Sequence, residues 1–162
     1  MRKRCALALT VLAFWACGGQ PDADHDQKTN SRTQAEILAL TDFDTEATVP
    51  PGIAEAWSGV RIQVVDREDG FQETYDIPVG GAELLGESGL VLSAGVFLPD
   101  FILDEDGITS RSMEPINPAV RVVISEDGMQ DFEGWLFAEM PEIHPYPHTR
   151  FQVLLLEGIP AG

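Results

Sequence analysis

The sequence predicts an all-β fold for residues 56–162, a compact β-sandwich or barrel of about seven or eight mostly antiparallel strands. Three observations lead to this prediction. After Trp57, apolar and polar residues alternate over short stretches. Turn signals, Asp-Gly above all, return about every ten residues. No stretch with helical periodicity longer than a few turns follows Trp57.

The first two strands form a predicted hairpin. Val60, Ile62 and Val64 occupy alternating positions of VRIQVVD, so their side chains share one face of a strand. Residues 67–70, Arg-Glu-Asp-Gly, supply a turn, because Asp-Gly favours the tight turns of hairpins. The chain then returns through residues 71–79, where apolar residues again alternate with polar ones.

The remaining strands follow the same pattern. Residues 80–89 are predicted to form a loop, and a longer apolar strand comes after it. Gly95 in that strand marks a bulge or a bend, because glycine adds no side chain to a sheet. The other predicted strand segments are residues 89–99, the two arms of a hairpin in 102–112, the two arms of a hairpin in 119–141, and residues 151–156.

Residues 134–137, Gly-Trp-Leu-Phe, lie in the second arm of the 119–141 hairpin. Because side chains alternate along a strand, Trp135 and Phe137 are expected on one face and Leu136 on the other. At least one of these two faces should belong to the hydrophobic core.

Residues 1–16 have the pattern of an export signal. Basic residues at positions 2–4 precede an apolar run of about a dozen residues, well short of the ~20 that cross a bilayer. The run ends in Ala16-Cys17-Gly18-Gly19, which resembles a bacterial lipoprotein signal. In that family the cysteine becomes the first residue and carries acyl chains such as palmitate, so the resemblance implies a membrane anchor at Cys17. The alternative is an ordinary secretory signal, with Cys17 left as a free thiol.

Residues 17–55 are expected to form a flexible acidic tether. The segment 18–31 is small and polar and contains nothing to bury. Residues 35–40, AEILAL, can form a short helix, and the prolines in 49–52, VPPG, are expected to stop it. Such a tether would hold the β domain away from a membrane surface.

Charge and cysteine content exclude several classes of function. The net charge is −17, and loss of residues 1–16 removes three of the 10 basic residues and none of the 27 acidic ones, giving −20. Such a surface repels nucleic acid and anionic lipid head groups. Cys5 and Cys17 are the only cysteines, so the β domain has no disulfide and no thiol for catalysis or metal binding. No cofactor is indicated, and the oligomeric state is left open.

The stretch between Phe97 and Val120 contains the candidate binding loop. Its prolines cannot take part in central strand pairing, and its short polar side chains can satisfy the backbone of an irregular segment. Asp100 is expected to pair with Arg111 or Arg121. Two interpretations remain open, a hydrogen-bonded crossover that links two sheets and a binding surface built on that rigid loop. The candidate residues are Asp100, Ser110, Arg111, Ser112 and Asn117.

His144 and His148 flank the sequence His-Pro-Tyr-Pro-His. Two imidazoles four residues apart can hold a metal ion on one face of a helix, but the two prolines favour an extended segment instead. The alternatives are a rigid loop between strands and a metal site formed by a bend in the chain.

Four pieces of sequence occur in a particular order: FLPDF at 97–101, ITSRS at 108–112, EPINPA at 114–119 and GWLF at 134–137. Over residues 57–160 this order resembles a family of small exported bacterial β proteins catalogued as a domain of unknown function. It is also similar to stretches in the extracytoplasmic domains of ResB-type cytochrome c biogenesis proteins. The second resemblance implies that His144 or His148 meets haem or a haem-bearing partner.

Three hypotheses of different classes follow. The first is a membrane-tethered lipoprotein of the cell envelope, with a non-catalytic β domain that binds an envelope protein and faces the periplasm from the outer membrane. The second is a metal- or haem-handling accessory of envelope biogenesis that uses His144 and His148. The third is a hydrolase of an envelope polymer, with Asp104, Glu114 or Glu126 as acid and base.

Overall fold

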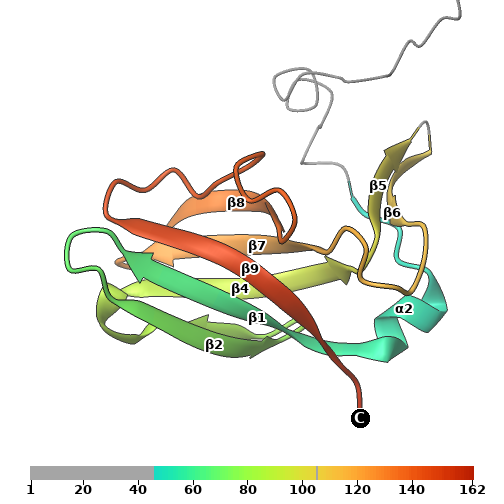
Figure 1. Ribbon diagram of the computed structural model, residues 1–162, viewed down its shortest axis with the longest axis horizontal. Coiled ribbons are helices and arrows are strands. Elements are labelled where there is room, and N and C mark those ends of the chain that lie inside the picture. Colours follow the sequence, from blue (N-terminus) through green and yellow to red (C-terminus); the bar gives the residue numbers. More distant parts are fainter. Residues whose placement is uncertain (1–45, 105) are drawn as a thin grey trace, which may run out of the picture. The chain divides into compact units, whose positions relative to one another are not determined.

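The computed structural model describes residues 46–104 and 106–162, which form a β-sandwich and confirm the predicted all-β fold. A three-stranded sheet, in the order β2-β1-β9, packs on a four-stranded sheet, in the order β3-β4-β7-β8, while the β5–β6 hairpin projects at one end (Figure 1). The pairs of named strands are antiparallel. The expected signal segment, Cys17 and the possible helix at 35–40 lie outside the described residues.

One α-helix and nine strands are found in the described residues, together with a single 3-10 helical turn, Gly86–Ser88. They are α2 Pro51–Ala56, β1 Trp57–Asp66, β2 Gln72–Pro78, β3 Ala82–Leu84, β4 Leu90–Leu98, β5 Phe101–Asp104, β6 Gly107–Ser110, β7 Ala119–Glu126, β8 Met129–Phe137 and β9 Phe151–Pro160.

The main core lies between the two sheets. Val60, Ile62 and Val64 of β1 are all buried in it, which confirms the face predicted from their alternation. Full burial of an aliphatic side chain of this size stabilises the folded state by about 1.5–3 kcal/mol. The neighbouring strand of the same sheet adds Phe151, Val153 and Leu155 of β9, and the facing sheet contributes Leu90, Leu92 and Ala94 of β4 and Val120, Val122 and Ile124 of β7.

Two local features match what the sequence predicts. Asp127 and Gly128, which join β7 to β8, have φ angles of 50° and 78°, the left-handed pair that a tight hairpin turn requires. Gly95 lies where the register between β4 and β7 shifts, so it marks a bulge.

Three element boundaries differ from the prediction. Residues 82–84 pair with β4 instead of remaining a loop, and their side chains are exposed, so no alternation of burial marked them in the sequence. Helix α2 begins within the segment VPPG, where no helix was predicted, because proline in the first turn costs no hydrogen bond. Strand β9 continues to Pro160 through its pairing with β1.

A second core covers the outer face of the four-stranded sheet near the hairpin. The ring of Phe101 in β5 packs edge-on against two rings of β8, at 5.2 Å from Trp135 and 5.0 Å from Phe137 between centroids. The residues before α2 join this layer, since the backbone N–H of Thr48 donates to the carbonyl of Ile108 at 2.8 Å. Buried members of the second core are Leu98, Phe101, Ile108, Ala119, Trp135, Phe137 and Ile143.

The two cores explain why the sequence 134–137 is apolar without interruption. Leu136 belongs to the main core, and Trp135 and Phe137 belong to the second one, so the predicted division between faces is confirmed. Both faces of β8 are buried at this point, as in strands that lie between two layers.

Replacing Trp135 with alanine should lower the free energy of unfolding by about 3–5 kcal/mol, because a fully buried ring leaves a cavity in the second core. Met129→Ala is the matched control, since Met129 opens the same strand and is 73% exposed. Urea unfolding followed by circular dichroism measures both variants. Equal stability of the two variants would contradict the second core.

Candidate functional site

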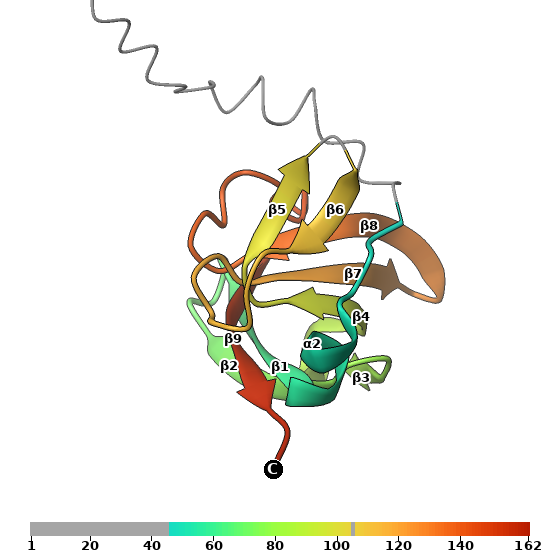
Figure 2. The same ribbon diagram turned by 90° about the vertical axis from the view of Figure 1, so that its right-hand side faces the viewer.

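The candidate binding loop belongs to an excursion of the chain out of the four-stranded sheet. Strand β4 ends at Leu98 and β7 starts at Ala119, and these two residues are register partners. Residues 99–118, called the excursion below, leave the sheet, form the β5–β6 hairpin and return to the same place (Figure 2). Residues 111–118 thus link the two-stranded sheet to the four-stranded one.

An ion pair between a buried carboxylate, Asp100, and an arginine that is 65% exposed, Arg111, holds the base of the excursion. The side chain of Asp100 is 1% exposed, and both of its oxygens accept hydrogen bonds from the guanidinium of Arg111, each at 3.1 Å. The backbone N–H of Arg111 also donates to the carbonyl of Asp100 at 3.0 Å. Of the two partners proposed for Asp100, the structure selects Arg111, because Arg121 pairs with Glu133 at 2.9 Å.

The other candidate residues satisfy the backbone around this pair. Ser110 Oγ accepts a hydrogen bond from the N–H of Asp100 at 2.9 Å and donates to the carbonyl of Ser112 at 3.0 Å. Asn117 Nδ2 donates to the carbonyl of Phe101 at 2.9 Å, and the N–H of Phe101 donates back to the carbonyl of Asn117 at 2.9 Å. Ser112 Oγ accepts from the N–H of Glu114 at 3.3 Å. All five candidate residues therefore lie together and support the excursion.

The electrostatics of this cluster favour the charged form of Asp100. Hydrogen bonds from the Arg111 guanidinium hold the pKa of Asp100 below its usual value, and they outweigh burial, which acts in the opposite direction. The same pair raises the pKa of Arg111. A buried carboxylate is stable only when paired in this way, so the cluster fixes one conformation of the loop.

The loop that follows the cluster exposes large apolar side chains. Met113 is 51% exposed and Ile116 is 61% exposed. Helix α2 lies against this loop, because a methyl group placed on Gly52 would touch the sulfur of Met113 at 3.9 Å. Met113 and Ile116 are named here the loop surface. They belong to a loop whose backbone is held by the Asp100–Arg111 ion pair and lies against α2.

The two histidines between β8 and β9 have structural contacts. His148 Nδ1 accepts hydrogen bonds from the backbone N–H groups of Arg150 at 3.2 Å and Phe151 at 2.9 Å. The His148 ring stacks between Tyr146 and Phe151, at 5.4 and 5.2 Å between centroids. His148 Nε2 lies 3.6 Å from Glu126.

His144 contacts a different part of the fold. Its Nδ1 lies 3.2 Å from both the N and the O of Trp135 in β8, a strand that pairs with β7 alone among the described strands. Burial lowers the pKa of His144, and the contact with the Trp135 carbonyl partly opposes that shift. The segment that carries His144 therefore lies against the edge of β8.

The residues proposed for metal binding and for hydrolysis are not gathered into a site. No group of three or more His, Cys, Asp or Glu in residues 46–104 and 106–162 is placed to hold a metal ion. Glu114 lies in the excursion just before β7, whereas Glu126 is the last residue of β7, roughly 20 Å further along the strand. Asp104 ends β5 and accepts a hydrogen bond from the N–H of Asp106 at 2.9 Å.

No protein-family model matches this chain, and neither a curated protein nor a solved structure matches it. Within the part of the chain that the structure describes, no helix has the length and apolar character needed to cross a membrane.

Asp100→Asn should lower the free energy of unfolding at neutral pH by about 1–3 kcal/mol, because a buried charged acceptor is lost. Folding lowers the pKa of Asp100 below the ~3.9 of an unfolded chain. The contribution of the Asp100 carboxylate to the free energy of unfolding is thus present above about pH 4, and it is lost as the pH falls through the folded-state pKa. Urea unfolding at several pH values should show the gap between the variant and the parent protein narrowing in acid.

Glu114→Gln serves as the control, since Glu114 is an exposed carboxylate of the same excursion without an ion pair to a described residue. It should leave stability unchanged across the pH range. A gap of the same size for both variants, or one that does not respond to pH, would contradict the role assigned to Asp100.

Proposed function

We propose that this protein is an exported lipoprotein, anchored to a membrane of the cell envelope through Cys17, whose β domain binds a protein partner without performing catalysis. The anchor is supported by the basic start, the short apolar run and the Ala16-Cys17-Gly18 sequence. The position after Cys17 is a glycine, Gly18, and not the aspartate that favours inner-membrane retention in enteric lipoproteins. The proposal therefore places the domain at the outer membrane, facing the periplasm.

The main support for partner binding is the exposure of the loop surface. Exposed apolar side chains are common singly, but Met113 and Ile116 stand on a short loop whose base is held by the ion pair of the buried Asp100 carboxylate with Arg111. A fixed loop loses little conformational freedom when a partner binds, so more of the contact energy remains as affinity. The hydroxyl of Ser110 and the carboxylate of Asp100 are already engaged in holding this loop, which supports a binding role over a catalytic one.

The anchor is tested by labelling the full chain with an alkyne analogue of palmitate in a bacterial host. Cys17→Ser should abolish the label and move the protein out of the membrane fraction, because the acylated thiol is gone. Cys5→Ser is the matched control, since it removes the other cysteine of the chain and should leave both readouts unchanged. Full labelling of Cys17→Ser would contradict the anchor.

Partner binding is tested by placing a photo-crosslinking amino acid at Ile116 in the anchored protein within intact cells. We expect one reproducible crosslinked band from Ile116 and none from Met129, which lies at the β7–β8 turn and is even more exposed, at 73% against 61%. Combining the probe at Ile116 with Arg111→Met should weaken the band, because the loop is released from Asp100. The proposal fails if Ile116 gives no band or gives the same bands as Met129.

A further inference from the structure

A recessed pocket lies at the end of the sandwich where β1 turns into β2, about 30 Å along β1 from the end that carries α2. Its volume is about 570 Å³, within the ~300–1,000 Å³ typical of small-ligand sites. The apolar wall is formed by the buried side chains of Val64, Leu85 and Phe151. Phe71 also lines the pocket and is 60% exposed, so one aromatic side chain of the pocket is accessible from solvent.

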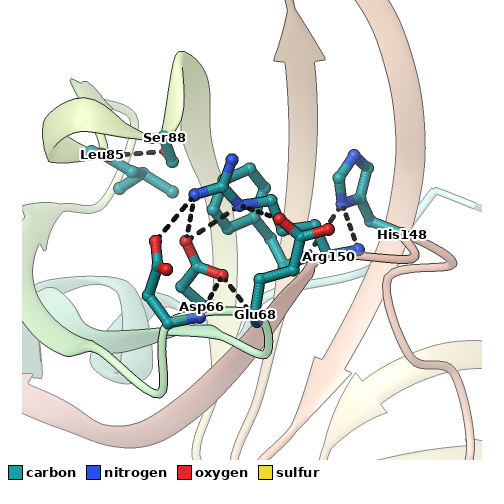
Figure 3. A network of polar contacts seen from close by, with 8 residues as sticks. Asp66, Glu68, Leu85, Ser88, His148 and Arg150 are labelled. Carbon is teal, nitrogen blue, oxygen red and sulfur yellow. Dashed lines mark hydrogen bonds and ion pairs between the residues drawn. The ribbon is translucent and has the colours of Figure 1, made fainter.

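The pocket is rich in carboxylates, and its one basic lining residue is already neutralised. Arg150 Nη2 lies 2.6 Å from Asp66 and 3.2 Å from Asp69, and Nε lies 3.6 Å from Glu68 (Figure 3). An anionic ligand would have to displace these partners to reach the guanidinium. The charged residues that line the pocket are Asp66, Asp69, Glu73, Glu87 and Arg150.

Two of these carboxylates have no cationic partner among the described residues. Glu73 accepts a hydrogen bond from the hydroxyl of Tyr75. Glu87 makes no hydrogen bond or ion pair with another described residue. Glu87 is carried by a single 3-10 helical turn, Gly86–Ser88, which directly follows Leu85 of the pocket wall. The pocket therefore presents uncompensated negative charge beside aromatic and apolar surface.

The rest of the domain shows the same imbalance of charge. From residue 46 to residue 162 the sequence has five arginines and no lysine against 21 acidic residues. Four of the arginines pair with carboxylates of their own chain, namely Arg61, Arg111, Arg121 and Arg150. The field around the domain is negative and attracts cations.

We propose that this pocket binds an organic cation with a short apolar stem, an alkylammonium or alkylguanidinium group. The positive charge of the ligand lies near Glu73 and Glu87. The apolar stem of the ligand packs on Phe71 and Tyr75, whose ring faces also attract cations. Two sources carry this chemistry, a lysine or arginine side chain of a peptide and a free polyamine. The pocket shares no residue with the loop surface, so this proposal stands whether or not that surface binds a partner.

Isothermal titration of the full chain in non-ionic detergent tests the proposal with defined probes. N-acetyl-arginine methylamide represents a peptide side chain, and spermidine represents a free polyamine. N-acetyl-citrulline methylamide has nearly the same shape as the arginine probe but no charge. We expect binding of at least one cationic probe, with the citrulline probe at least tenfold weaker than the arginine probe where the latter binds. Binding of spermidine alone identifies a polyamine site, and binding of the arginine probe identifies a peptide side chain.

Paired variants connect binding to the pocket. A chain with both Glu73→Gln and Glu87→Gln should bind the cationic probe at least tenfold more weakly, and Phe71→Ala should also weaken it. The control chain carries Glu55→Gln and Glu139→Gln, two exposed carboxylates away from the pocket, and removes the same total charge. Its affinity should equal that of the parent protein.

Three outcomes would overturn the proposal. The first is that neither cationic probe binds the parent protein. The second is that the citrulline probe binds as tightly as the arginine probe. The third is that the pocket variants and the control chain lose affinity equally, since the attraction would then come from the total charge of the domain. Thermal unfolding of each variant confirms that the titrated protein is folded.

Discussion

The ion pair between the buried carboxylate of Asp100 and Arg111 is the constraint on which the candidate site depends. It lies where the chain leaves β4 and returns to β7, so it determines how the excursion stands on the sheet. A carboxylate that is 1% exposed would be costly without a partner, and Arg111 and the hydroxyl of Ser110 stabilise this region only when the loop has one conformation. Polar side chains here therefore hold structure in an irregular segment that cannot rely on strand pairing.

Two consequences follow from a fixed excursion. The β5–β6 hairpin places Phe101 and Ile108 over the outer face of β8, which gives Trp135 and Phe137 a second core. On its other side the returning loop holds apolar side chains towards solvent, where a partner can reach them without first ordering the chain. The same polar cluster thus links the packing of one end of the sandwich to the surface for which we propose partner binding.

The sequence predicted the parts of the fold in which burial follows a regular pattern. Alternation identified the buried face of β1, and Asp-Gly located the β7–β8 turn. The sequence analysis missed β3, because this exposed edge strand is held by backbone hydrogen bonds, which do not depend on side-chain type. The sequence narrowed the ion-pair partner of Asp100 to two arginines. The structure decided between them, since Arg111 pairs with Asp100 and Arg121 pairs with Glu133. The pocket at Arg150 was not predicted, because its walls come from segments far apart in the sequence.

Amide hydrogen exchange measured by NMR tests the role of the ion pair most directly. The N–H groups of Phe101, Arg111 and Asn117 all donate to carbonyls at the base of the excursion. If the pair fixes this base, their protection should approach that of Val122 in the centre of the four-stranded sheet, because exposing them would require the core to open. Exchange of these three amides as fast as in an unprotected loop, while Val122 stays protected, would contradict a fixed excursion.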